Sequence, residues 1–243
     1  MKTYQDLQEG LNDPNIFKAI FLAGGPGSGK SYVVGQTTGG TGLVTINSDD
    51  AFEVMLKKAG LDAKMPKSEE EPRDAIRNRA KKVTAERKGN AIEGRLGLII
   101  DGTGREYDKI VKQSVQLKQL GYDTHMIFVN TSLDTALLRN SKRDRTVPEQ
   151  IAVKSWKDVQ SNIGKFSQHF RQNFIVVDNN DSEEDVMTPV FKQVKRLLKK
   201  RVTSPRAKAW IENEMKLRGI TKAPSARNIG GGGSGKFRGK LPG

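Results

Sequence analysis

The chain has 243 residues, with 42 Lys and Arg, 28 Asp and Glu, two histidines and no cysteine. The lack of cysteine excludes a disulfide framework, a thiolate metal site and a thiol nucleophile, and two histidines argue against a histidine-based metal site. No apolar run approaches the roughly 20 residues of a membrane span, and the first residues lack the apolar core of a signal peptide. We therefore expect a cytoplasmic protein that does not contact a membrane.

The net charge of +14 is concentrated at the C-terminal end. Residues 192–243 contain 15 Lys and Arg but only two acidic residues, so this segment carries about +13 and the preceding 191 residues about +1. A cationic extension of this kind attracts nucleic acid or another polyanion without reading its sequence. The same charges would occur on a solvated helix face followed by a disordered end, and the composition does not separate the two interpretations.

The predicted elements begin after a polar lead-in at residues 1–16. Short apolar runs, rich in β-branched residues or Phe, are typical of buried parallel strands; they lie at 17–23, 42–47, 96–101, 122–130 and 173–178. Helical patterns lie between and after them, at 29–36, 50–59, 71–86, 106–120, 132–143, 148–163 and 182–201. Because alternating strands and helices form right-handed crossovers, we expect an α/β protein in three layers, α/β/α, with a five-stranded, mainly parallel sheet.

The first predicted strand is followed by a phosphate-binding motif at residues 24–31, Gly-Gly-Pro-Gly-Ser-Gly-Lys-Ser, which fits G-x-x-x-x-G-K-[ST] at every fixed position. Glycines allow successive backbone N–H groups to converge on one anion, and the following helix directs the positive end of its dipole at the same point. Lys30 would reach the β- and γ-phosphates, and Ser31 would hold Mg²⁺. The motif predicts a P-loop NTPase fold that binds a nucleoside triphosphate and Mg²⁺, with phosphate contacts from Gly25, Gly27, Ser28, Gly29, Lys30 and Ser31.

Carboxylates follow the second and third predicted strands. The second strand ends in Asn-Ser-Asp-Asp at residues 47–50. An acceptor hydroxyl needs a base that aligns it with the γ-phosphate and takes its proton, and Asp49 is the candidate, with Asp50 as the alternative. Either residue is also suited to cap the helix that begins near residue 51. The third strand ends at Asp101, which would face Mg²⁺ or the acceptor, or else close the strand through an Asx-type turn.

A basic segment follows the fourth predicted strand. Arg139 and Arg143 are four residues apart and would share one face of the helix predicted at 132–143. Two adjacent guanidinium groups suit a phosphoryl group whose charge redistributes during transfer, and a basic lid also excludes water. The alternative is a solvated helix end, where cations are favoured. The insertion at 61–95, which is also rich in Lys and Arg, is expected to form helices over the substrate side.

The organisation changes after the fifth predicted strand. The turn at 178–180 is a candidate for the adenine side of the nucleotide site. A last helix is expected at 206–218, and residues 230–235 have the glycine-rich composition of a flexible linker. The predicted domains are therefore a lead-in at 1–16, a P-loop kinase domain at 17–201 and a basic, Gly-rich, flexible tail at 202–243.

Together these motifs resemble the 5′-kinase domain of phage polynucleotide kinases and, more widely, zeta-toxin-type P-loop kinases. The resemblance covers residues 17–178 and is most specific in the Arg-Asn-Ser-Lys-Arg sequence at 139–143, followed by Val-Pro at 147–148. It implies an ATP- and Mg²⁺-dependent kinase. It also implies the roles of the site residues: donor-phosphate binding by Lys30, Ser31 and Arg143, general base catalysis by Asp49, and organisation of the site by Asp101 and Arg139.

One departure from the phage kinases concerns the acceptor. That family has an arginine three residues after the catalytic Asp, which contacts the nucleic-acid phosphate, and this chain has Phe52 there. Other cations of the chain are candidates to replace the missing contact, namely Arg73, Arg77, Arg79 and Arg105.

Three functions follow from these patterns. The motif series and the basic tail favour transfer of the γ-phosphate to the 5′-hydroxyl of DNA or RNA. Phe52 favours a nucleotide sugar or another small molecule as acceptor, as in the zeta-toxin branch. The basic, Gly-rich end also fits a third function, a nucleic-acid-binding or assembly protein that uses ATP binding as a structural switch.

Overall fold

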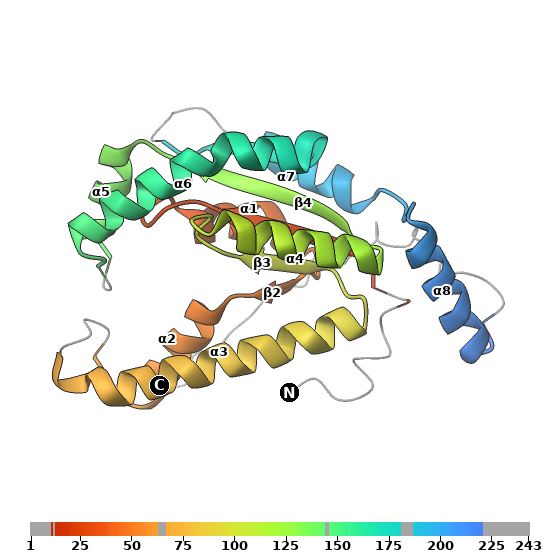
Figure 1. Ribbon diagram of the computed structural model, residues 1–243, viewed down its shortest axis with the longest axis horizontal. Helices are drawn as coiled ribbons and strands as arrows, with labels where there is room; N and C mark the ends of the chain where they lie inside the picture. The colour runs from red at the N-terminus through yellow and green to blue at the C-terminus, as the bar shows by residue number, and fades with distance from the viewer. Residues whose placement is uncertain (1–10, 12, 63–66, 144–145, 181–186, 221–243) are drawn as a thin grey trace, which may run out of the picture.

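A computed structural model describes residues 11, 13–62, 67–143, 146–180 and 187–220. Its centre is a five-stranded, all-parallel sheet with the strand order β2-β3-β1-β4-β5 (Figure 1). The strands are β1 (Lys18–Ala23), β2 (Val44–Ile46), β3 (Leu98–Asp101), β4 (Asp123–Asn130) and β5 (Phe174–Asp178). The predicted α/β fold with a five-stranded parallel sheet is confirmed, and the phosphate loop follows its central strand.

The central strand β1 is buried along its whole length. It pairs in parallel with β3 on one side and with β4 on the other, so that Ile20 lies opposite Ile99 and His125. A strand that is covered on both faces favours apolar side chains at nearly every position, which explains the apolar run from Ala19 to Ala23. The buried Lys18 is accommodated by an ion pair with Asp123.

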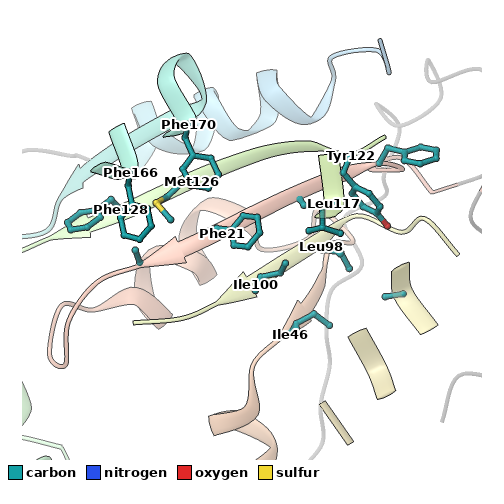
Figure 2. Packing of buried hydrophobic residues seen from close by; sticks show 14 of the residues in the cluster. Phe21, Ile46, Leu98, Ile100, Leu117, Tyr122, Met126, Phe128, Phe166 and Phe170 are labelled. Carbon is teal, nitrogen blue, oxygen red and sulfur yellow. The ribbon is translucent and has the colours of Figure 1, made fainter. Parts of the chain in front are cut away.

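Helices cover both faces of the sheet. On one face lie α4 (Tyr107–Leu120), α6 (Glu149–Phe170) and α8 (Pro205–Leu217), and on the other α1 (Lys30–Thr38) and α7 (Met187–Leu198). Figure 2 shows the first of these layers, where aromatic side chains from α6 meet side chains from the strands, among them Phe21, Met126, Phe128, Phe166 and Phe170. The second layer is smaller and aliphatic, with Ile20, Leu22, Val33 and Val194 at its centre.

Beside the edge strand β2, α2 (Ser48–Lys58) and α3 (Glu70–Glu93) lie next to each other (Figure 1). They bury a small cluster of their own, formed by Phe52, Leu56 and Ala80. A short 3₁₀ turn, η2 (Lys67–Glu69), precedes α3. The charged insertion at 61–95 forms η2 and α3, as expected, and α3 packs against α2, which carries Asp49 and Asp50. Its position over the substrate side stays a prediction.

Several helix ends differ from the predicted ones. The helix predicted at 71–86 continues to Glu93, because Ala91 beyond its predicted end is buried in the main core. The helix predicted at 148–163 continues to Phe170, because Phe166 and Phe170 pack against the sheet. Burial of these apolar side chains outweighs the weak local helix propensity of the intervening residues. The helix predicted at 182–201 is observed over Met187–Leu198, and residues 181–186 lie outside the described residues.

The last described helix, α8, packs on the body of the molecule. Its Trp210 meets the buried Phe17 edge to face, with ring centroids 5.5 Å apart, and the Arg95 guanidinium lies 5.7 Å from the centroid of the Trp210 ring. A further 3₁₀ turn, η3 (Arg171–Asn173), leads from α6 into β5. The Gly-rich stretch predicted to be flexible lies outside the described residues. Within the part of the chain that the structure describes, no helix has the length and apolar character needed to cross a membrane.

Candidate active site

The phosphate loop connects the buried end of β1 to the first turn of α1. Gly29 is the N-cap of α1 and has a φ of 80°, a left-handed conformation that favours glycine. A methyl group at this position would also overlap the side-chain amide of Asn179. Gly27 has a φ of 74°, and a methyl group there would overlap the carbonyl oxygen of Ala136 in α5 (Leu133–Ser141). The loop is therefore held between α5 and the turn that follows β5.

Lys30 folds back over the loop. Its Nζ donates a hydrogen bond to the carbonyl oxygen of Gly24 at 2.7 Å and a longer one to that of Gly25 at 3.4 Å. Burial lowers the pKa of Lys30, the carboxylates of Asp101 and Asp49 oppose this, and the charge of Arg143 lowers the pKa further. The structure thus brings together Lys30, Asp49, Asp101 and Arg143, which the sequence analysis selected separately.

Asn47 links the carboxylates at the ends of β2 and β3. Its Oδ1 accepts a hydrogen bond from the backbone N–H of Asp49 at 2.9 Å, so Asn47 is the N-cap of α2. The interpretation of Asp49 or Asp50 as the cap is therefore wrong, because the helix begins two residues earlier than predicted. Asn47 Nδ2 donates to Asp50 Oδ1 at 2.8 Å and to Asp101 Oδ2 at 3.0 Å. The Asn-x-Asp-Asp sequence predicted the two aspartates as site residues, but it did not predict that Asn47 bridges Asp50 and Asp101.

Asp101 lies in a strongly perturbed environment. Burial raises its pKa, and the nearby charges of Asp50 and Asp49 raise it further, whereas Lys30 lowers it. Burial together with the charges of Glu53 and Asp49 also raises the pKa of Asp50. Perturbed carboxyl groups of this kind are concentrated at functional sites, although ion-pair networks produce them too.

The residues present fit a metal ion that arrives with the nucleotide. Within the described residues, no group of three or more His, Cys, Asp or Glu side chains is arranged to hold a metal ion. Asp101 Oδ1 is buried and has no hydrogen-bond partner in the described part of the chain, and an unpaired carboxylate oxygen suits a cation or its water. Ser31, the other predicted ligand, is exposed in the first turn of α1. Mg²⁺ is usually held by one or two such groups together with substrate phosphates.

The two arginines of the predicted lid do not share a helix face. α5 ends at Ser141, so Arg139 is helical, whereas Arg143 lies two residues beyond the last helical residue. The helix ends here because the Asn140 side chain makes two hydrogen bonds with the backbone of Val147. Asn140 Nδ2 donates to the carbonyl oxygen of Val147 at 2.7 Å, and Asn140 Oδ1 accepts from the N–H of Val147 at 3.1 Å. These bonds turn the chain back toward α6. Arg139 still reaches the loop region through its hydrogen bond to Asn179, and Arg143 is close enough to Lys30 for its charge to lower the pKa of that lysine.

Two further residues contact the loop region: Trp156, which was not predicted as a site residue, and Asn179, which belongs to the turn predicted on the adenine side. Trp156 of α6 packs against Gly25, and its Nε1 donates to the carbonyl oxygen of Thr131 at 2.9 Å. Asn179 Nδ2 donates to the carbonyl oxygen of Ser28 at 2.8 Å. The role of the turn at 178–180 on the adenine side stays a prediction, and its Asn179 amide contacts the phosphate loop.

On the acceptor side, Phe52 is 1% exposed, and the guanidinium carbon of Arg77 lies 4.1 Å above the centre of its ring. Of the four candidate cations, Arg77 is thus placed beside position 52. Arg73 instead lies within ion-pair distance of Glu70 and Asp74, at 3.9 and 3.8 Å. The remaining candidates, Arg79 and Arg105, are exposed.

The Zeta toxin family model matches residues 3–188 of the chain. Solved structures of similar fold include a candidate kinase from Chloroflexus aurantiacus J-10-fl, 16% identical with a TM-score of 0.50, over 76% of this chain and 97% of that chain. They also include the AvrRxo1-ORF1:-ORF2 complex with ATP, 12% identical with a TM-score of 0.50, over 74% of this chain and 62% of that chain. A structure from the PezAT chromosomal toxin–antitoxin system of Streptococcus pneumoniae is 16% identical with a TM-score of 0.48, over 83% of this chain and 97% of that chain. A comparison with curated proteins finds no match.

At these identities the structural neighbours show the fold alone, whereas the family match extends over more than half of the chain. The resemblance to zeta-toxin-type kinases is thereby confirmed, and the resemblance to phage polynucleotide kinases stays a prediction. The chain belongs to the Zeta toxin family of P-loop kinases.

Proposed function

We propose that the protein transfers the γ-phosphate of ATP to a hydroxyl group of a small phosphorylated molecule such as a nucleotide sugar. The observation that carries this proposal is the group of charges around Lys30: Asp101, Arg143 and Asp49 all act on its pKa. Transfer to a hydroxyl requires cations that bind the reacting phosphate and a carboxylate that aligns the acceptor. The edge of the sheet provides both kinds of group.

The donor side of the proposal depends on the loop and the lid. The backbone N–H groups of the loop and the Lys30 ammonium would bind the β- and γ-phosphates, and Arg139 and Arg143 would stabilise the charge that develops during transfer. Mg²⁺, when bound with ATP, neutralises part of the phosphate charge and keeps the phosphates oriented. Ser31 and Asp101 are the residues that would hold it.

Asp49 would act as the general base. It is exposed on the first turn of α2, and its carboxylate is near enough to Lys30 to raise the pKa of the lysine. An acceptor hydroxyl that donates a hydrogen bond to Asp49 would lie beside the phosphate held by Lys30. Its proton would pass to the Asp49 carboxylate as the new oxygen–phosphorus bond forms and the bond to the leaving ADP breaks.

The choice of a small acceptor rests on Phe52. This side chain is buried between α2 and α3, so it does not provide the arginine contact to a nucleic-acid phosphate that the phage kinases have. Arg77 covers the Phe52 ring from α3. Membership of the Zeta toxin family supports the same class of acceptor.

The test is to incubate the protein with ATP and a panel of nucleotide sugars and to look by mass spectrometry for products heavier by one phosphate. Asp49→Asn should lower kcat by about 10²- to 10⁴-fold, as expected for loss of a general base, and should change the Kd for ATP by less than about twofold. A wild-type protein that binds ATP but phosphorylates no member of the panel would exclude nucleotide sugars as acceptors.

Asp108 offers a matched control for Asp49. Each aspartate is the second residue of its helix and is exposed, Asp49 in α2 and Asp108 in α4. Both substitutions to Asn therefore remove a comparable favourable interaction with a helix dipole. Asp108→Asn should leave kcat within about twofold of wild type. Equal losses of kcat in the two variants would show that Asp49 is not the base.

A 5′-hydroxyl end of DNA or RNA is the second candidate acceptor, favoured by the charge of residues 192–243. Within the described part of this segment, exposed cations follow one another along and after α7, including Lys192, Lys195, Arg196, Lys199 and Lys200. Such a surface would attract a polynucleotide non-specifically. Labelled ATP and 5′-hydroxyl oligonucleotides test this function, because a polynucleotide kinase would label their ends at low salt.

A further inference from the structure

Asn179 occupies the junction of three parts of the molecule. It is the first residue after β5, is 7% exposed, and its backbone N–H donates to the carbonyl oxygen of Asn130 at 2.8 Å, which extends the pairing of β4 with β5. Its side-chain Nδ2 donates to the carbonyl oxygen of Ser28 in the phosphate loop at 2.8 Å. Its own carbonyl oxygen accepts a hydrogen bond from Arg139 Nη1 at 2.6 Å. We propose that Asn179 is a positioning residue that fixes the ATP-binding conformation of the phosphate loop and couples it to the lid helix α5.

The contact with Ser28 determines the direction of a loop N–H group. The peptide bond between Ser28 and Gly29 is trans, so its carbonyl oxygen and its N–H point in opposite directions. Asn179 holds the carbonyl on its own side, and the Gly29 N–H is therefore directed to the other side. Because glycine adopts both signs of φ with similar ease, an unanchored peptide at this position would be able to rotate and present its carbonyl oxygen to a phosphate instead. The hydrogen bond from Asn179 opposes that rotation.

The geometry around Gly29 supports the same role. Asn179 Nδ2 lies where a side chain at position 29 would have to begin, so the amide and the glycine are packed directly against each other. The backbone N–H of Asn179 is bonded to the carbonyl oxygen of Asn130 at the end of β4, and β4 in turn pairs with the central strand β1. A rigid element that supports a binding loop reduces the conformational freedom that ligand binding would otherwise have to remove.

The same turn also positions the lid. Asn180, the next residue, accepts a hydrogen bond through Oδ1 from the backbone N–H of Ser132, the N-cap of α5, at 2.8 Å. Arg139 near the other end of α5 bonds Asn179. The turn therefore contacts α5 at both ends while it holds the phosphate loop, and a change at Asn179 would act on phosphate binding without touching the acceptor side.

The test compares the Kd values for ATP and AMP by calorimetry, with full-length protein and no acceptor present. Asn179→Ala should raise the Kd for ATP by about 5- to 30-fold, the range expected when one buried hydrogen bond is lost. The Kd for AMP, which lacks the β- and γ-phosphates, should change by less than about twofold. Asn179→Asp keeps the shape of the side chain but cannot donate to Ser28 when ionised, and it should weaken ATP binding at least as much as the alanine variant does.

Asn173 provides the matched control. At the other end of β5, its Nδ2 donates to the carbonyl oxygen of Thr124 at 3.1 Å, so Asn173→Ala removes the same kind of bond at the opposite edge of the sheet. This variant should bind ATP as wild type does. Equal weakening of ATP and AMP by Asn179→Ala, or equal weakening of ATP by Asn173→Ala, would overturn the inference.

The result does not depend on the acceptor of the proposed function. A protein that binds ATP through this loop but phosphorylates no nucleotide sugar would refute the proposed function and leave the role of Asn179 intact. Unchanged ATP binding in both Asn179 variants would refute the role of Asn179 and leave the proposed function intact.

Discussion

Substitution of Asn47 tests whether one side chain both begins α2 and holds two carboxylates of the site. Asn47 Oδ1 accepts from the backbone of Asp49, and Nδ2 donates to Asp50 and Asp101. Asn47→Ala removes all three hydrogen bonds. It also leaves Asp50 and Asp101 without their shared donor, in a place where burial already raises the pKa of both carboxyl groups.

The expected loss can be worked out from these bonds. Removal of an N-cap side chain costs about 1 kcal/mol, and loss of the partly buried bond to Asp101 costs about 1 kcal/mol more. The bond to Asp50 is exposed, so its contribution is small. Asn47→Ala should therefore lower the free energy of unfolding by about 2 kcal/mol, which corresponds to a Tm lower by about 4 to 8 °C for a chain of this size.

Two further substitutions at position 47 separate the contributions. Serine keeps an oxygen that caps the helix but does not reach the carboxylates, so Asn47→Ser should cost about 1 kcal/mol. Asn47→Asp also keeps a capping oxygen, but it brings another carboxylate next to Asp50 and Asp101. Its free energy of unfolding should fall further below that of wild type as the pH is raised from 5 to 8, because the added carboxylate and its neighbours ionise together.

Urea unfolding followed by tryptophan fluorescence measures these differences. The expected order of the free energy of unfolding at pH 7.5 is wild type, Asn47→Ser, Asn47→Ala, with steps of about 1 kcal/mol. If serine and alanine are equally destabilising, the capping bond contributes nothing measurable. If serine is as stable as wild type, the bridge to Asp101 contributes nothing. Either result would refute the structural account of this residue.

Three other changes have distinct expected outcomes. Asp101→Asn should lower kcat and should raise the free energy of unfolding at pH 8. Because the carboxyl pKa of Asp101 is raised in the folded state, the stability of the wild type falls as the pH rises through that pKa, and the advantage of the variant should shrink toward pH 4. Urea unfolding at several pH values checks this. Gly27→Ala should raise the Kd for ATP, measured by calorimetry, by more than about 30-fold, because position 27 has a positive φ and a side chain there would overlap α5. Gly35→Ala, at a position of α1 with open space around it, should leave the Kd for ATP unchanged. Trp210→Ala should lower the free energy of unfolding by about 2 kcal/mol, because its packing on Phe17 is lost, and should leave the Kd for ATP unchanged. A thermal unfolding curve identical to that of wild type would contradict the packing described for α8.

The strands, the phosphate loop and α8 can be predicted from local patterns. A strand buried on both faces requires a continuous apolar run, and a loop that wraps a phosphate requires glycines at fixed spacings. Both signals are complete within fewer than ten residues. The carboxyl ends of neighbouring parallel strands lie at one edge of the sheet, so the proximity of Lys30, Asp49 and Asp101 also follows once the fold class is known.

The ends of the longer helices cannot be predicted in this way. α3 continues through Gly89 and Asn90 because Ala91 is buried, and α6 continues to Phe170 because its last turns cover the sheet. α5 stops early, which separates Arg143 from the helix of Arg139, because the Asn140 side chain binds the backbone of Val147. In each case a tertiary contact outweighs the local propensity.

The polar contacts that arrange the site depend still more on tertiary structure. Asn47 and Asp101 are 54 residues apart, and Asn179 and Ser28 are 151 residues apart. Nothing in the local composition distinguishes these asparagines from others in turns, since asparagine is common in turns for local reasons. Only the order of the strands brings them to the phosphate loop and its carboxylates, because residues that follow neighbouring parallel strands meet at the same edge of the sheet.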